Sequence, residues 1–190
     1  MKQHSEWLRV VVVFVVAGAL LWPSARRQVQ ATEVANPTLV LETVQGTIEI
    51  ELLRGEAPET VEYVVNLVEK NFYRGLRFHR IETGLVQIGD PNSRNVTRQA
   101  SWGTTGARPT IGIAEFSPAM RHVRGAVGLA HAGDPKGASS QFYIMKQGSP
   151  SLNGKHTIFG QVRKGFVALD KLRVADVLKL ATIKEAGQTS

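Results

Sequence analysis

The chain has 190 residues, of which 43% are hydrophobic and 21% charged, with a formal net charge of +7 and no cysteine. This length suits one domain with a full hydrophobic core and leaves little room for two. The lack of cysteine excludes disulfide bonds, thiol catalysis and thiolate metal sites. The positive charge is compatible with polyanions, but the basic residues are spread along the sequence without a nucleic-acid-binding motif, so nucleic acid is not expected as a partner.

The N-terminal segment has the pattern of a targeting sequence. Lys2 and Arg9 precede an uninterrupted apolar run over residues 10–22. A basic start and an apolar core of this length are typical of a secretory signal peptide, since a spanning helix usually needs about 20 apolar residues. The arginine pair at 26–27 directly follows the apolar run and could hinder cleavage, so an uncleaved membrane anchor is the alternative. We therefore predict a signal peptide or anchor plus a polar tether over residues 1–37, and an exported, periplasmic or otherwise extracytoplasmic location.

Two segments after the tether predict an antiparallel β-hairpin. Residues 47–52 alternate strictly between apolar and polar side chains, so one face of this strand is expected in a core. The apolar residues 39–41 precede it, and Gln45 and Gly46 supply a turn between the two segments.

An amphipathic helix is predicted next. Val61, Val65, Val68 and Phe72 recur at helical spacing, and Pro58 stands near the expected first turn. Such a stripe of apolar residues on one helix face indicates packing against the core.

The rest of the chain reads as short strands separated by glycine, proline and asparagine. Its apolar runs are residues 111–113, 126–130, 141–145 and 157–162, followed by a short helix over 167–172 and a last strand over 182–184. Many short strands with few helices predict an all-β protein, a closed antiparallel β-barrel with helical caps.

Residues 78–90 place Arg80 and Gln87 on a mostly apolar, extended run. A guanidinium stays charged and offers five hydrogen-bond donors in a rigid fork. On an apolar surface it can therefore donate a hydrogen bond to a carbonyl oxygen or to a nitrogen lone pair of a bound chain. The alternative is an arginine at a strand end that forms a salt bridge.

Several common chemistries have no motif in the sequence. The histidines do not stand in metal-binding spacings, so no metal is predicted. Gly125 and Gly128 lack the third glycine and the helix of a dinucleotide loop. Ser139 and Ser140 lack a nucleophile elbow, which argues against a hydrolase, and no cofactor is expected.

Several blocks together resemble the cyclophilin family of peptidyl-prolyl isomerases. They are residues 78–80 and 86–91, then 125–130 leading to 140–144, then 152–160. The resemblance spans roughly residues 39–184 and implies an eight-stranded antiparallel barrel capped by two helices, in a domain that we place at 38–187. It also implies proline-containing peptides and unfolded or folding proteins as partners. No coiled-coil segment is visible, so a monomer is expected.

The resemblance implies a role for particular residues. Arg80 would donate to the prolyl nitrogen in the twisted transition state, and Gln87 would hold the carbonyl side and orient Arg80. Ala130 and His131 would pair with the substrate through their backbone, and Gln141 would line the neighbouring groove. The proline ring would occupy an apolar pocket formed by Leu85, Val86, Tyr143, Leu152 and His156.

One departure from the family pattern keeps a second function open. The interval from Arg80 to Gln87 is shorter than the family usually has, and Gly84, Leu85 and Val86 stand where an aromatic residue and a methionine are usual. The alternative is therefore a catalytically weak chaperone or proline-segment-binding module that uses the same groove. A scaffold that docks through its basic surface is a more remote possibility.

Overall fold

The computed structural model describes residues 35–186. The predicted signal or anchor over residues 10–22 lies outside them. No helix between residues 35 and 186 is long and apolar enough to cross a membrane. The strands in this part of the chain are β1 (Thr38–Thr43), β2 (Gly46–Leu52), β3 (Arg80–Ile81), β4 (Leu85–Ile88), β5 (Ala126–Leu129), β6 (Phe142–Met145), β7 (Ile158–Lys164) and β8 (Leu178–Lys184). The helices are α1 (Pro58–Glu69), α2 (Phe166–Lys171) and the short 3-10 helices η1 (Pro91–Arg94), η2 (Val96–Ser101), η3 (Pro135–Gly137) and η4 (Pro150–Leu152).

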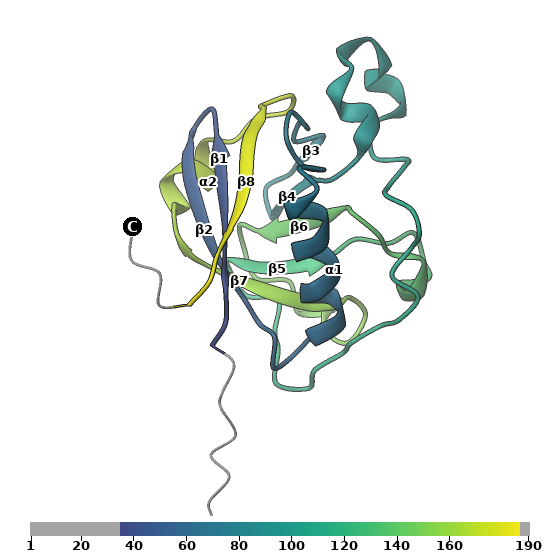
Figure 1. Ribbon diagram of the computed structural model, residues 1–190, viewed down its shortest axis with the longest axis vertical. Coiled ribbons are helices and arrows are strands. Elements are labelled where there is room, and N and C mark those ends of the chain that lie inside the picture. The colour runs from purple at the N-terminus through teal and green to yellow at the C-terminus, as the bar shows by residue number, and fades with distance from the viewer. Residues whose placement is uncertain (1–34, 187–190) are drawn as a thin grey trace, which may run out of the picture. The chain divides into compact units, whose positions relative to one another are not determined.

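The eight strands form one antiparallel sheet in the order β3-β4-β6-β5-β7-β2-β1-β8 (Figure 1). The prediction of eight antiparallel strands is confirmed, but the predicted closure is wrong, because β3 and β8 do not pair along their length. β3 contains two residues and pairs only with β4. The segments before the two edge strands approach each other through an isolated bridge between Arg77 and Val177. The sheet is therefore a curled half-barrel.

The first hairpin follows the predicted alternation. β1 pairs with β2 around the turn at Gly46, whose positive φ of 126° suits glycine. Ile48, Ile50 and Leu52 are fully buried, while the polar residues between them face outward. The strict period of two in the sequence therefore decided both the strand and its buried face.

Helix α1 buries the predicted valines Val61, Val65 and Val68 in the main core. The residue before the helix, Ala57, supplies no side-chain cap. The cap comes instead from Glu115, whose carboxylate accepts hydrogen bonds from the Thr60 amide at 2.8 Å and the Thr60 hydroxyl at 2.7 Å. A carboxylate at a helix N-terminus is favourable because it satisfies free N–H groups and complements the helix dipole. This contact fastens the long connection between η2 and β5 to α1.

Three later predictions have different outcomes. The short helix is present as α2, and the last strand is part of β8. Residues 111–113 were expected as a strand, but this prediction is wrong: they form irregular backbone, with Gly112 at a φ of 78°. Their amides pair with the loop at η3, since Ile111 N–H donates to the Ala138 carbonyl at 2.9 Å. The glycine conformation interrupts the extended chain.

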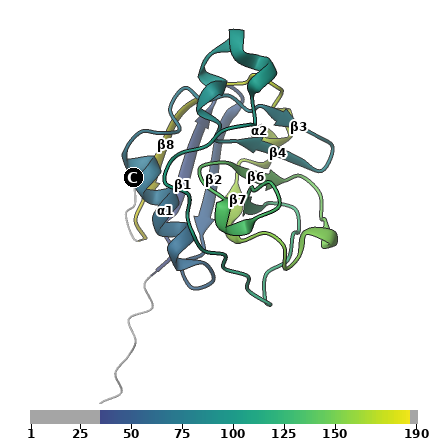
Figure 2. The same ribbon diagram turned by 90° about the vertical axis from the view of Figure 1, so that its right-hand side faces the viewer.

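The sheet has apolar side chains on both faces near β4, β6 and β5. Phe142 and Ile144 enter the main core, whereas Tyr143 and Met145 belong to a second, smaller cluster on the opposite face. That face is covered by the loop around Met120 and by Leu152 at the end of the short helix η4. Figure 2 shows the same half-barrel from the side, with the teal segment of η2 projecting from it as in Figure 1. The outer face of β4, β6 and β5 is the place where a site can form.

Candidate functional site

Strand pairing aligns the central residues of the site. Arg80 lies opposite Gln87 across β3 and β4, and Gln87 lies opposite Tyr143 across β4 and β6. Tyr143 in turn lies opposite Gly128 on β5. Because directly opposite residues point to the same face of an antiparallel sheet, these side chains form one row on the outer face.

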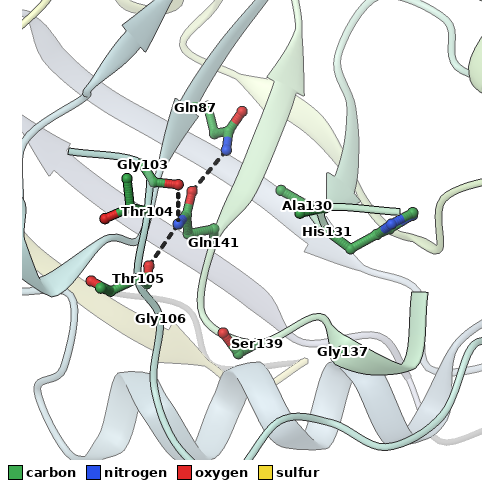
Figure 3. A pocket seen from close by; sticks show the side chains of 11 residues that line it. Gln87, Gly103, Thr104, Thr105, Gly106, Ala130, His131, Gly137, Ser139 and Gln141 are labelled. Atoms are coloured by element: carbon green, nitrogen blue, oxygen red, sulfur yellow. Dashed lines mark hydrogen bonds between the residues drawn. The ribbon is translucent and has the colours of Figure 1, made fainter. Parts of the chain in front are cut away.

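A chain of hydrogen bonds connects Arg80 and Gln87 of this row to Gln141, the residue before β6. Arg80 Nη1 donates to Gln87 Oε1 at 3.2 Å, and Gln87 Nε2 donates to Gln141 Oε1 at 2.8 Å. Gln141 Nε2 donates to the carbonyls of Gly103 at 3.0 Å and Thr105 at 2.6 Å, as Figure 3 shows. Both side-chain amides are therefore held in one orientation, and the loop after η2 is fastened to the site.

Arg80 also forms the salt bridge that was the alternative interpretation of this residue. Its Nε donates to Glu82 Oε1 at 2.7 Å, and both side chains are half exposed. An exposed ion pair of this kind contributes little to stability. Since Nε and Nη1 use two of the five guanidinium N–H groups, the others remain available to a ligand.

An apolar cluster lies beside the polar row, and it is called the pocket below because it contains most of the residues predicted to surround the proline ring. Leu85, Leu152 and Ala130 pack with the buried Tyr143 in the second cluster, together with Met120. The assignment of Val86 to this pocket does not fit the structure. Val86 is fully buried in the main core because successive strand residues point to opposite faces. Leu85 therefore lines the pocket and Val86 does not.

Two histidines form one wall of the site. The rings of His131 and His156 stack with centroids 4.1 Å apart, and His156 meets the Tyr143 ring edge-on at 5.6 Å. His131 Nε2 lies 2.9 Å from the Lys155 carbonyl, which fixes that ring. The Ala130 amide already donates to the Gln141 carbonyl, so the remaining backbone groups of Ala130 and His131 are the ones a substrate could reach.

A hollow of about 230 Å³ adjoins the pocket. Its lining residues are Gln87, Gly103, Thr104, Thr105, Gly106, Ala130, His131, Ala132, Gly137, Ser139 and Gln141 (Figure 3). This volume suits a side chain of a bound peptide better than a whole small ligand. The described residues contain no group of three histidine, aspartate or glutamate side chains placed to hold a metal ion.

Sequence reasoning missed several contributors to this face. Met120 and His122 come from the loop before β5, and Gly103 and Thr105 come from the loop after η2. None of them stands in a periodic pattern, because irregular backbone places them. The only signal was the presence of a histidine and a methionine close before the glycine-rich β5 segment.

We expect the folded state to lose stability in mildly acidic solution. Burial lowers the pKa of His79, His122 and His156 below the ordinary value of 6.5. As the pH falls below that value, the unfolded chain takes up protons that the folded protein binds less readily, so the free energy of unfolding decreases. Urea unfolding midpoints should therefore fall between about pH 7.5 and pH 5, above the range where carboxylates titrate.

A His79→Gln variant provides the control for this pH effect. It should show a smaller decrease, since one of the three titrating groups is gone. Midpoints that stay constant over this range in the unmodified protein would contradict the prediction.

An arginine, two linked glutamines and an apolar pocket on one face of a β half-barrel make a site suited to an extended, largely apolar peptide. Residues 38–187 match the family described as cyclophilin type peptidyl-prolyl cis-trans isomerase/CLD. A probable peptidyl-prolyl cis-trans isomerase of Brucella suis is 35% identical over 162 residues, which cover 82% of each chain. Peptidyl-prolyl cis-trans isomerase B of Bacillus subtilis is 38% identical over 133 residues, covering 70% of this chain and 87% of that protein.

Two solved structures share the fold of this chain. The cyclophilin-type peptidyl-prolyl cis-trans isomerase of Cryptosporidium parvum has the same fold, with a TM-score of 0.68 at 23% identity over 81% of this chain and 99% of that chain. A second structure of that protein, in the presence of the dipeptide Ala-Pro, gives a TM-score of 0.63 at 25% identity, covering 78% of this chain and 96% of that one. The chain therefore belongs to the cyclophilin-type peptidyl-prolyl cis-trans isomerases.

Proposed function

We propose that this isomerase holds an Xaa-Pro segment on the outer face of β4, β6 and β5. The proline ring would occupy the apolar pocket beside Tyr143, and the guanidinium of Arg80 would face the prolyl nitrogen. The observation that carries this proposal is the position of Arg80 and Gln87 as direct partners in β3 and β4, next to that pocket.

The chemistry needs only a donor in the right place. Rotation about an Xaa-Pro amide is opposed by a barrier of about 18–20 kcal/mol, because resonance is lost in the twisted state. The prolyl nitrogen then gains a lone pair, so a donor aimed at it stabilises the transition state more than the planar amide. The bond from Arg80 to Gln87 restricts the guanidinium, and Gln87 itself is held by Gln141.

The binding-only alternative is not favoured. It supposed that the shorter interval between Arg80 and Gln87 misplaces the arginine. The two residues are nevertheless in register, and their side chains are hydrogen bonded at 3.2 Å. The interval between Arg80 and Gln87 is shorter than usual for the family, yet these two residues still lie opposite each other across β3 and β4.

A peptide titration tests where the substrate binds. Adding an Ala-Pro-containing tetrapeptide to ¹⁵N-labelled protein should shift the amide signals of Gln87, Ala130, His131 and Tyr143. The same peptide with alanine in place of proline serves as the control and should shift them much less. Shifts confined to Phe116, Gly133 and Gly154 in the hollow on the other side of the histidine wall, with Gln87 and Tyr143 unchanged, would contradict the proposed site.

We also propose that the protein works outside the cytoplasm, where it assists folding of exported chains as a monomer. The support for a location outside the cytoplasm is the basic start and apolar run of the N-terminal segment. Residues 1–37 fused to a reporter that is active only after export should give activity, and Val13→Asp should abolish it by interrupting the apolar run. Activity in the soluble fraction would indicate a cleaved signal, and activity in the membrane pellet an anchor. A fusion as inactive as the variant would refute export.

A further inference from the structure

A buried histidine lies directly behind the pocket. His122 is 2% exposed and comes from the loop that also carries Met120. Its Nε2 lies 2.8 Å from the hydroxyl oxygen of Tyr143, and its Nδ1 lies 3.0 Å from Asn153 Oδ1. The histidine therefore joins β6, which carries the pocket tyrosine, to the loop that follows Leu152.

The neighbouring bonds determine which ring nitrogen carries the proton. The backbone amide of His122 also donates to Asn153 Oδ1, at 2.9 Å, so this oxygen is an acceptor. Nδ1 must then donate to it, and in the neutral ring Nε2 is left as an acceptor. Burial lowers the pKa of His122, which favours the neutral ring. The Tyr143 hydroxyl consequently donates to Nε2.

The adjacent strand leaves room for this arrangement. A Cβ atom at position 128 would lie 2.4 Å from both Cζ and Oη of Tyr143, so only glycine fits beside the tyrosine in its present position. The ring of Tyr143 packs between His122 at 5.9 Å and His156 at 5.6 Å, measured between centroids. The ring is thus confined on three sides and its hydroxyl is bonded at the end.

We propose that His122 is a positioning residue of the isomerase site: through its bonds to Asn153 and Tyr143 it fixes the tyrosine ring as the pocket wall and holds the loops of Met120 and Leu152 over it. This inference rests on the proposed position of the proline ring. A wall that contacts the proline equally in the planar and twisted states contributes uniform binding, so its loss raises KM and leaves kcat nearly unchanged. His122 touches no reacting atom and acts only through Tyr143.

A double-mutant cycle on the full chain tests the proposal. His122→Leu and Tyr143→Phe each remove the same hydrogen bond, which corresponds to about a two- to tenfold change in affinity. Each variant should raise KM for an Xaa-Pro peptide by about this factor with kcat within about twofold. The double variant should be no worse than the more affected single one, because the shared bond is lost only once.

Two outcomes would overturn the proposal: single effects that multiply in the double variant, or an equal fall in kcat with KM unchanged. If His122→Leu does not fold, the hydrogen bond between His122 and Tyr143 can be tested instead by the ¹⁵N chemical shifts of the His122 ring. Nε2 should have the shift of a hydrogen-bonded acceptor in the unmodified protein and lose it in Tyr143→Phe, and an unchanged signal would refute the bond. If the unmodified protein showed no isomerase activity, the proposed function would fail, while peptide dissociation constants would still test the positioning.

Discussion

Replacing Arg80 with alanine is expected to lower kcat/KM for Xaa-Pro isomerisation by about 10²–10³-fold, the usual cost of removing one preorganised donor from a transition state. The guanidinium is half exposed and its partners are Glu82 and Gln87, so the fold should be unaffected. The measurement is a protease-coupled or NMR assay of a short Xaa-Pro peptide. An unchanged circular dichroism spectrum and unfolding midpoint would show that the loss is catalytic.

Two variants sharpen this experiment. Arg80→Lys keeps the charge but loses the planar fork that reaches Gln87 and the substrate together, so it should recover only a small part of the activity. Glu82→Gln removes the exposed ion pair and should leave activity within about twofold, because such pairs are worth little. If Arg80→Ala kept most of the activity, Arg80 would be a structural arginine and the proposed mechanism would be wrong.

Replacing Gly89 with alanine is expected to cause the largest loss of stability, a decrease of about 3–5 kcal/mol in the free energy of unfolding. Gly89 has a φ of +115°, and a Cβ there would lie 2.1 Å from the Ser140 carbonyl oxygen and 2.6 Å from Gln141 Cα. The clash is with backbone, so no side-chain rotation relieves it. The variant would also displace Gln141, which holds Gln87 in place.

Gly84→Ala is the matched control for this substitution. Gly84 lies in the turn between β3 and β4, its φ is not positive, and a Cβ there would meet no atom within 4 Å. Its effect should be within about 1 kcal/mol. Urea unfolding of the two variants measures the difference, and a Gly89→Ala protein as stable as Gly84→Ala would show that the backbone at Ser140 can move.

The half-barrel explains why one apolar residue, Val86, was assigned to the wrong face, while the polar residues named with it lie together. Arg80, Gln87 and Gln141 were named from the family motifs; strand pairing brings Arg80 opposite Gln87, and a hydrogen bond joins Gln87 to Gln141. Leu85 and Val86 were both assigned to the pocket because they stand where the family usually has its pocket residues. A strand places neighbours on opposite faces, so only the residue in phase with Gln87 can line the site. Applying this alternation to residues 85–88 would have excluded Val86 in advance.

The sequence by itself determined the strands and helices with strong periodicity, such as residues 47–52 and the valine stripe of α1, because local alternation decides which face is buried. Only the tertiary structure decided the opening between β3 and β8, the cap that Glu115 provides for α1, and the position of His122 behind Tyr143. These features depend on contacts between residues far apart in the chain and on loops without a repeating pattern. The free energy that stabilises these features comes from individual hydrogen bonds and packed surfaces, and the local spacing of residues in the sequence does not reveal such contacts.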